Sequence, residues 1–247
     1  MTDSLTQDLV KEAMANAGHA YIRPKDAATL LVLDRSGAEV RVLMGRRHMR
    51  HAFMPGKFVF PGGRVDPGDS RVKVAGAYHP AVEEKLAAQH KGRASAARIR
   101  AFTVAAIRET YEEAGLFIGR HTGDRWPAKG DFEAFSERGI LPDLEPMRMV
   151  ARAITPPGRP RRFDTRFLAV WSDAIVDRLP EGTGPSGELE DVAWVTLDEA
   201  KRMELPAITL KVLDDLHNRL REDPELSPGA PVPFYYRRGA GFAQDLI

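Results

Sequence analysis

Three glutamates within five positions are the residues of this sequence whose types and spacing best suit chemistry. Glu109, Glu112 and Glu113 belong to the segment TVAAIRETYEEAGL, residues 103–116. In an α-helix, positions i, i+3 and i+4 lie on one side, so the three carboxylates would project together. A divalent cation would remove their mutual repulsion, which is roughly a few tenths of a kcal/mol per pair. Oxygen ligands of this charge suit Mg²⁺ or Mn²⁺.

An E-x-x-E-E pattern standing alone is more often a solvated acidic face of a helix than a metal site. Arg108 precedes Glu112 by four residues, so it can hold that carboxylate through a charge-assisted hydrogen bond. Upstream, the segment FPGGRVDPGD, residues 60–69, places Gly62 and Gly63 directly after a short apolar stretch. Glycine permits backbone angles that other residues avoid, so a strand is expected to break into a loop here.

The two segments together resemble the Nudix box, the signature of the Nudix hydrolases, written G-x5-E-x7-R-E-U-x-E-E-x-G-U with U aliphatic. The matching positions are Gly63, Arg108, Glu109, Glu112, Glu113, Gly115 and Leu116. The sequence departs from the pattern at Asp69, where the family has Glu, and at Thr110, where it has an aliphatic residue. It also has 38 residues, 70–107, where the family has seven.

The 31 additional residues resemble the split box of the coenzyme A diphosphatase-like branch of the family. The segment RFDTRF, residues 162–167, is similar to a segment of the same branch. The coenzyme A signature is incomplete, because Ala52 stands where that signature has Arg. The resemblance implies an α/β fold of the Nudix type, an α/β/α sandwich with a mixed sheet, carrying a helical insertion at about residues 70–100.

The resemblance also implies a metal-dependent hydrolase of a diphosphate linkage in a nucleoside-diphosphate derivative, with coenzyme A or acyl-coenzyme A as candidate substrates. Glu109, Glu112 and Glu113 would hold the cation, with Arg108 among the catalytic residues. The general base would be one of these glutamates or a loop carboxylate, for which we name Glu188 or Glu190, although both could simply flank a strand. Two other functions stay open: a nucleoside-triphosphate pyrophosphohydrolase, and a non-catalytic nucleotide-binding module.

Two arginine-rich segments could supply positive charge for phosphate groups, because a guanidinium can fork onto phosphate oxygens. One precedes the Pro-Gly-Gly loop, and the other, which also contains Arg159 and Arg161, surrounds RFDTRF. For each segment a solvated basic loop is about as common as phosphate binding. The residues predicted to bind substrate are Arg46, Arg47, Arg50, Gly62, Gly63, Arg162 and Arg166.

The composition excludes several other classes of protein. The chain has no cysteine among 247 residues, which excludes disulfide scaffolds, thiolate metal sites and cysteine nucleophiles. Its net charge of +1 gives no reason to expect a nucleic-acid polymer as partner. No apolar run approaches the ~20 residues of a membrane span, and the N-terminus lacks an export signal. We therefore expect a cytoplasmic protein, and a homodimer because dimers are common in the family.

Hydrophobic periodicity predicts one mixed α/β domain over residues 1–247, with an extended C-terminal tail at about 224–247. The segment 119–146 is expected to be mostly irregular. The predicted helices span residues 6–16, 81–89, 102–114, 132–138, 197–203 and 208–220, and the predicted strands span 27–33, 40–44, 58–60, 147–154, 166–171 and 191–195.

Overall fold

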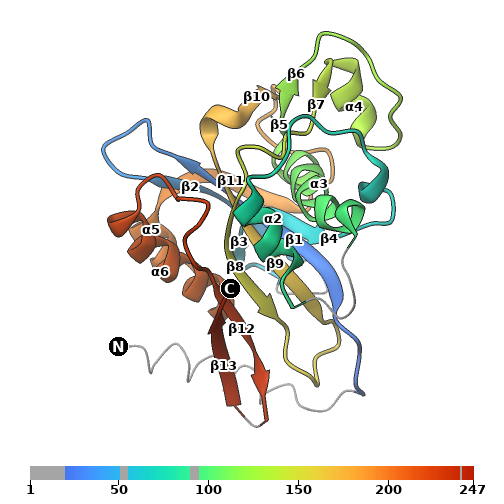
Figure 1. The fold of residues 1–247 in the computed structure, drawn as a ribbon. Coiled ribbons are helices and arrows are strands. Elements are labelled where there is room, and N and C mark those ends of the chain that lie inside the picture. Colours follow the sequence, from blue (N-terminus) through green and yellow to red (C-terminus); the bar gives the residue numbers. More distant parts are fainter. Residues whose placement is uncertain (1–19, 51–54, 90–94, 240) are drawn as a thin grey trace.

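The computed structural model describes residues 20–50, 55–89, 95–239 and 241–247. Its centre is a mixed sheet with the strand order β11-β2-β1-β9-β8-β12-β13, to which β3 and β4 add by pairing with β2 and β1 (Figure 1). The strands are β1 (Lys25–Asp34), β2 (Arg41–Arg47), β3 (Phe58–Val59), β4 (Gly62–Arg64), β8 (Arg148–Ile154), β9 (Phe163–Trp171), β11 (Leu189–Thr196), β12 (Pro233–Arg238) and β13 (Gly241–Leu246).

Strand β1 lies in the middle of the sheet and is covered on both faces. It pairs in parallel with β9 and antiparallel with β2 across the turn at residues 35–40. Leu30 and Val32 belong to one hydrophobic cluster, whereas Leu31 and Leu33 belong to the other. A strand buried on both faces needs apolar residues at every position, which explains the continuous apolar run in the sequence. The hairpin predicted from residues 27–44 is therefore confirmed.

Helices cover both faces of the sheet (Figure 1). Helices α2 (Pro80–Ala87) and α3 (Ala96–Ala114) contribute to the cluster that contains Leu30. Helices α5 (Leu197–Arg202) and α6 (Ala207–Glu222) contribute to the cluster that contains Leu31. The predicted α/β/α sandwich is the observed architecture.

Helix α3 begins six residues before the predicted start at position 102 and ends where the sequence indicated. Ser95 caps its N-terminus by accepting a hydrogen bond from the Arg98 amide, and the added turns bury Ile99 in the core. Gly115 ends the helix in the left-handed region, with φ 69°. The glutamates therefore sit in the last two turns of a long, well-anchored helix.

The additional residues of the split box form part of the core. Tyr78 donates a hydrogen bond to Thr103 of α3 at 2.7 Å, and Val82 and Leu86 of α2 are fully buried. The helix predicted at 81–89 corresponds to α2. The insertion therefore packs beside α3 on the same face of the sheet, rather than projecting as a loop.

Residues 119–146 are mostly irregular, as predicted, and the short helix predicted at 132–138 is observed at 132–137. Two short antiparallel pairs organise it and the residues beside it, β5 with β10 and β6 with β7. The elements are β5 (Leu116–Ile118), β6 (Arg120–His121), α4 (Phe132–Glu137), β7 (Ile140–Leu141) and β10 (Ile175–Arg178). Strands of two to four residues are too short to show a hydrophobic period, and β10 pairs with a distant segment, so the sequence carries no signal for them.

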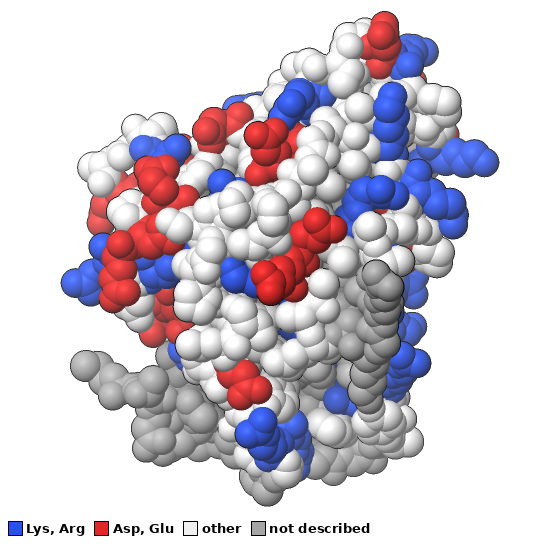
Figure 2. Space-filling view, in the orientation of Figure 1, with Lys and Arg blue, Asp and Glu red and all other residues white. Residues whose placement is uncertain are grey.

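The C-terminal tail is extended, as predicted, and joins the main sheet. Strands β12 and β13 form a hairpin, and β12 pairs in parallel with β8. The helix predicted at residues 6–16 lies outside the described residues. Within the described ranges, no helix is long and apolar enough to cross a membrane. Acidic and basic side chains are interspersed over the face shown in Figure 2, in keeping with the net charge of +1.

Candidate active site

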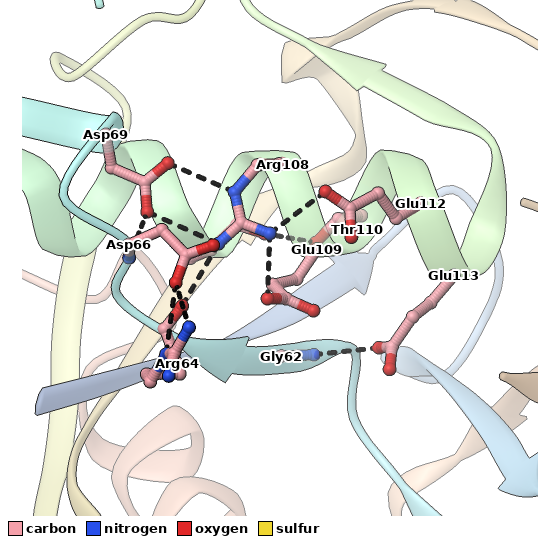
Figure 3. A network of polar contacts seen from close by, with 10 residues as sticks. Gly62, Arg64, Asp66, Asp69, Arg108, Glu109, Thr110, Glu112 and Glu113 are labelled. Atoms are coloured by element: carbon pink, nitrogen blue, oxygen red, sulfur yellow. Dashed lines mark hydrogen bonds and ion pairs between the residues drawn. The ribbon is translucent and has the colours of Figure 1, made fainter. Parts of the chain in front are cut away.

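Two glycines bring the backbone of the Pro-Gly-Gly segment against the acidic side of α3. A Cβ atom on Gly63 would lie 2.4 Å from the Glu109 carboxylate, and one on Gly62 would lie 2.6 Å from the Thr29 Cα. The Gly62 amide donates a hydrogen bond to Glu113 Oε2 at 2.9 Å (Figure 3). The expected loop is only partly observed, because residues 62–64 form the short strand β4 on β1. A side chain on Gly63 would therefore meet Glu109 of α3, and one on Gly62 would meet Thr29 of β1.

The Arg108 guanidinium is the hub of a buried polar network (Figure 3). Its Nη1 atom donates to Glu109 Oε1 and to Glu112 Oε1, both at 2.9 Å. Its Nε atom donates to Asp69 Oδ1 at 3.0 Å, and its Nη2 atom to the Arg64 carbonyl oxygen at 3.0 Å. Burial by itself would lower the pKa of Arg108, but the hydrogen bond to Asp69 and the neighbouring negative charges raise it. The cation is therefore permanently charged and holds two of the three glutamates.

Burial raises the pKa values of all three helix glutamates. For Glu112 the pKa rises to about 7, against the opposing hydrogen bond from Arg108. For Glu113 it rises to about 8, because burial and the charge of Glu109 outweigh the hydrogen bond from the Gly62 amide. The pKa of Glu109 is also raised, chiefly by burial. These carboxylates need positive charge beyond that of Arg108 if all three are to be ionised near neutral pH.

The residues fit a hard divalent cation. All donors are carboxylate oxygens, and among the described residues the buried Glu113 Oε1 has no hydrogen-bond partner. The same residues include no set of three acidic or imidazole side chains already converging on one ion position. The contacts of Arg108 account for this, since its guanidinium lies between Glu109 and Glu112. Gathering the carboxylates on one ion requires some of these contacts to rearrange.

An elongated cavity of about 450 Å³ begins at Glu109 and reaches the C-terminal hairpin. Arg47, Gly62, Gly63 and Glu188 line it with Glu109. Further arginines line it at Arg64, Arg159 and Arg161, and small side chains of the sheet line it at Ala27, Thr29, Ala153 and Thr165. Helix α6 contributes Ile208 and Thr209. The aromatic lining residues are Phe60, Phe163, Phe167, Tyr235 and Phe242. The cavity thus has an acidic end bordered by positive charge, and an aromatic end.

The structure brings only some of the predicted substrate-binding residues to this cavity. Arg47, Gly62 and Gly63 line it, whereas Arg46 pairs with Asp191 at 2.7 Å and Arg50 lies outside.

Arg162 and Arg166 do not line the cavity either. Arg162 donates to the carbonyl oxygens of Thr155 and Ile22, and Arg166 is fully buried beside Asp164 and over the Phe102 ring. Successive side chains of a strand point to opposite faces, so the odd-numbered residues of β9 face the cavity and Arg166 faces α3. Arg159 and Arg161, from the loop before β9, line the cavity instead.

The two candidate loop bases occupy different environments. Glu188 lines the cavity, and its negative charge contributes to the raised pKa values of Glu109 and Glu113. Glu190 lies 3.3 Å from the His48 ring and 3.6 Å from Arg46, and it does not line the cavity. Glu188 and Glu190 are two residues apart, so the alternation of side chains along a strand would place both on the same face. Their spacing in the sequence therefore could not show which of them lines the cavity. Their positions favour Glu188.

No family model matches the chain, and no curated protein matches it. Among solved structures, it is similar to a Nudix hydrolase from Alicyclobacillus acidocaldarius, with 29% identity over 79% of this chain and 91% of that chain, and a TM-score of 0.57. This chain has the Nudix hydrolase fold. RenU, a Nudix hydrolase from M. smegmatis, is 16% identical, with 84% of this chain and 93% of that one covered and a TM-score of 0.42.

A further similar structure is the Nudix domain of NrtR from Shewanella oneidensis in complex with ADP ribose, at 14% identity, with 85% and 97% of the two chains covered and a TM-score of 0.44. The similarity to the Alicyclobacillus enzyme carries the functional argument, because its identity and TM-score are higher. Together with the box glutamates on α3, it supports a Nudix-type pyrophosphohydrolase.

The two halves of the Nudix box are joined across the insertion by Asp69. Its side chain is 3% exposed, accepts the hydrogen bonds of Arg108, and accepts another from the Asp66 amide at 2.8 Å. A carboxylate at this position therefore anchors the Gly-rich segment to helix α3. The sequence showed the substitution of Glu by Asp but carried no signal for this ion pair.

Proposed function

We propose that this protein hydrolyses a diphosphate linkage in nucleoside-diphosphate derivatives and uses Mg²⁺ or Mn²⁺. The observation that carries the proposal is that Glu109, from the carboxylate cluster of α3 (Figure 3), lines one end of a cavity that arginines also line. A diphosphate is polyanionic, so it can approach Glu109 and its neighbours only when cations offset the repulsion. The arginines of the cavity wall supply part of that positive charge.

Glu109, Glu112 and Glu113 would hold the cation. A bound divalent ion would offset phosphate charge and lower the pKa of a bound water molecule. Arg108 orients Glu109 and Glu112, and the Gly62 amide orients Glu113. Glu188, which lines the cavity with Glu109, is the loop carboxylate best placed to accept a proton from the attacking water, in preference to Glu190.

Coenzyme A or an acyl-coenzyme A is the narrower proposal for the substrate. The split box and the RFDTRF segment support it, and so does the length of the cavity, which suits a molecule that extends well beyond its diphosphate. Arg47, Arg64, Arg159 and Arg161 would bind phosphate groups. A cytoplasmic single-domain protein and a homodimer remain predictions from the sequence.

A screen of purified protein with Mg²⁺ or Mn²⁺ tests the function. Coenzyme A, dinucleotides, nucleotide sugars and nucleoside triphosphates would be incubated separately, and the product masses measured. Two phosphomonoester products from a diphosphate-bridged substrate are expected. Pyrophosphate released from a triphosphate would favour the alternative hydrolase, and binding without turnover across the panel would favour the non-catalytic module.

A further inference from the structure

We propose that the C-terminal hairpin β12–β13 forms a distal binding subsite for the nucleobase of a phosphorylated nucleoside, with Phe242 and Tyr235 as specificity-determining residues. Both side chains line the cavity at the end away from the glutamates. The position of the subsite follows from the residues that line the cavity. Its relation to the cleaved bond rests on the proposed function.

One row of paired residues crosses the sheet along the floor of the cavity. Arg64 of β4 pairs with Ala27 of β1, which pairs with Thr165 of β9, then Ala153 of β8 and Tyr235 of β12. All five residues line the cavity. Four strand spacings of about 4.8 Å place the two ends about 19 Å apart. Small side chains occupy the middle of the row and long ones stand at its ends, so the floor is an open trough.

The distal wall is held rigidly by α6. The Tyr235 hydroxyl donates a hydrogen bond to Asp215, which also forms an ion pair with Lys211. Tyr235 is 3% exposed. Phe242 of the adjacent strand lines the same cavity but is only half-buried. A ring held in place by a hydrogen bond, next to a more accessible ring, can bind a flat ligand with little loss of side-chain entropy.

The opposite face of the hairpin is supported by the insertion. Phe234 and Tyr236 stack there with ring centroids 4.8 Å apart, and the Arg152 guanidinium lies 4.4 Å above the Phe234 ring. Arg152 also donates to the carbonyl oxygen of Ala88, directly after α2, at 2.9 Å. The insertion thereby helps to fix the strand that carries Tyr235.

The chemistry of the cavity favours a nucleobase with a phosphate over an alkyl chain. Phe163 and Phe167 of β9, the middle strand of the row, add aromatic surface, and Arg159 and Arg161 from the β8–β9 loop line the same cavity. Aromatic rings stack on any nucleobase, and arginines pair with phosphate. A hydrocarbon chain would use the rings but gain nothing from the arginines.

Titration calorimetry of the full chain with AMP and with ribose 5-phosphate tests the subsite without requiring turnover. The two probes share sugar and phosphate and differ in the base. We expect AMP to bind at least about tenfold more tightly. We expect Phe242→Ala to remove most of that advantage while the affinity for ribose 5-phosphate stays unchanged, and Phe242→Tyr to retain it.

Tyr236→Ala is the matched control, because it removes a ring from the other face of the same hairpin; its preference for AMP should equal that of the wild type. Undetectable AMP binding, equal binding of the two probes, or equal losses in Phe242→Ala and Tyr236→Ala would overturn the proposal. Octyl phosphate binding more tightly than AMP through Phe242 would instead identify an alkyl site and would also overturn it. A normal AMP preference in a protein that hydrolyses no diphosphate would refute the proposed function alone.

Discussion

The two ends of the cavity are built on different principles. At the acidic end, buried charges are held by hydrogen bonds, and the single side chain of Arg108 contacts three carboxylates, those of Asp69, Glu109 and Glu112. At the distal end, aromatic side chains are placed by the register of the sheet, and Tyr235 is aligned through four strand pairings. Charge chemistry needs fixed spacing on one helix, which leaves a motif in the sequence. A recognition surface needs only aromatic rings that sheet pairing brings together, and such rings leave no motif in the sequence.

The largest effect is expected from Glu112→Gln at the acidic end. Glutamine keeps the size of the side chain and can still accept from Arg108, but it lacks the charge needed to hold a cation. Loss of several kcal/mol of metal-assisted stabilisation corresponds to a fall in kcat of about 10³-fold. Steady-state kinetics with Mg²⁺ measures this, and Glu84→Gln on the exposed surface of α2 is the control. Turnover close to wild type would remove Glu112 from the metal site.

The second effect concerns the ion pair that joins the halves of the box. Asp69→Ala leaves the buried Arg108 without its main partner, so we expect the free energy of unfolding to fall by about 3 kcal/mol or more, with a loss of activity. Asp66→Ala removes a more exposed pair with Arg64, whose side chain is 52% exposed, and should cost about 1 kcal/mol at most. Urea denaturation compares them. Equal effects would show that Asp69 has no anchoring role, and Asp69→Asn serves if Asp69→Ala does not fold.

The raised pKa values predict a dependence of stability on pH that the metal should remove. Glu112 and Glu113, with pKa values of about 7 and about 8 against an ordinary value of 4.5, bind protons in the folded state that the unfolded state has released. The free energy of unfolding without metal should therefore fall as pH rises from 4.5 to about 8. Thermal unfolding with EDTA or Mg²⁺ measures this. Stabilisation by Mg²⁺ should be greater near pH 8 than near pH 5, and an equal shift at both would contradict it.

The smallest effect is expected from Tyr235→Phe at the distal end. The substitution removes the hydroxyl that donates to Asp215, which keeps its ion pair with Lys211. We expect the free energy of unfolding to fall by about 1.5 kcal/mol, with KM for a nucleotide substrate rising a few-fold and kcat unchanged. Denaturation and steady-state kinetics measure the two effects. A fall in kcat with constant KM would mean that the two ends of the cavity are not separate in function.

Local patterns predicted the elements that carry the chemistry. Helix α3, its end at Gly115 and the hairpin of β1 and β2 follow from periodicity and turn residues. The pairing of Arg108 with Glu112 follows from helical spacing. The predictions of substrate-binding residues were wrong where the face of the sheet decides whether a side chain reaches the cavity. Arg166 belongs to an arginine-rich segment, yet it is buried on the face of β9 away from the cavity. The short strands of residues 116–147 pair with partners about 20 to 60 residues away in the sequence, and hydrophobic periodicity carries no information about such pairing.

The sequence by itself determined the type of fold and the identity of the acidic residues, because helix spacing and glycine conformation are local properties of the chain. Only the tertiary structure decided which arginines line the cavity, that Asp69 joins the halves of the box, and that the C-terminal hairpin forms the distal wall. These outcomes depend on strand register and on which face each residue occupies. Sheet pairing links residues as far apart as Arg64 and Tyr235, and no pattern within either segment specifies that partnership.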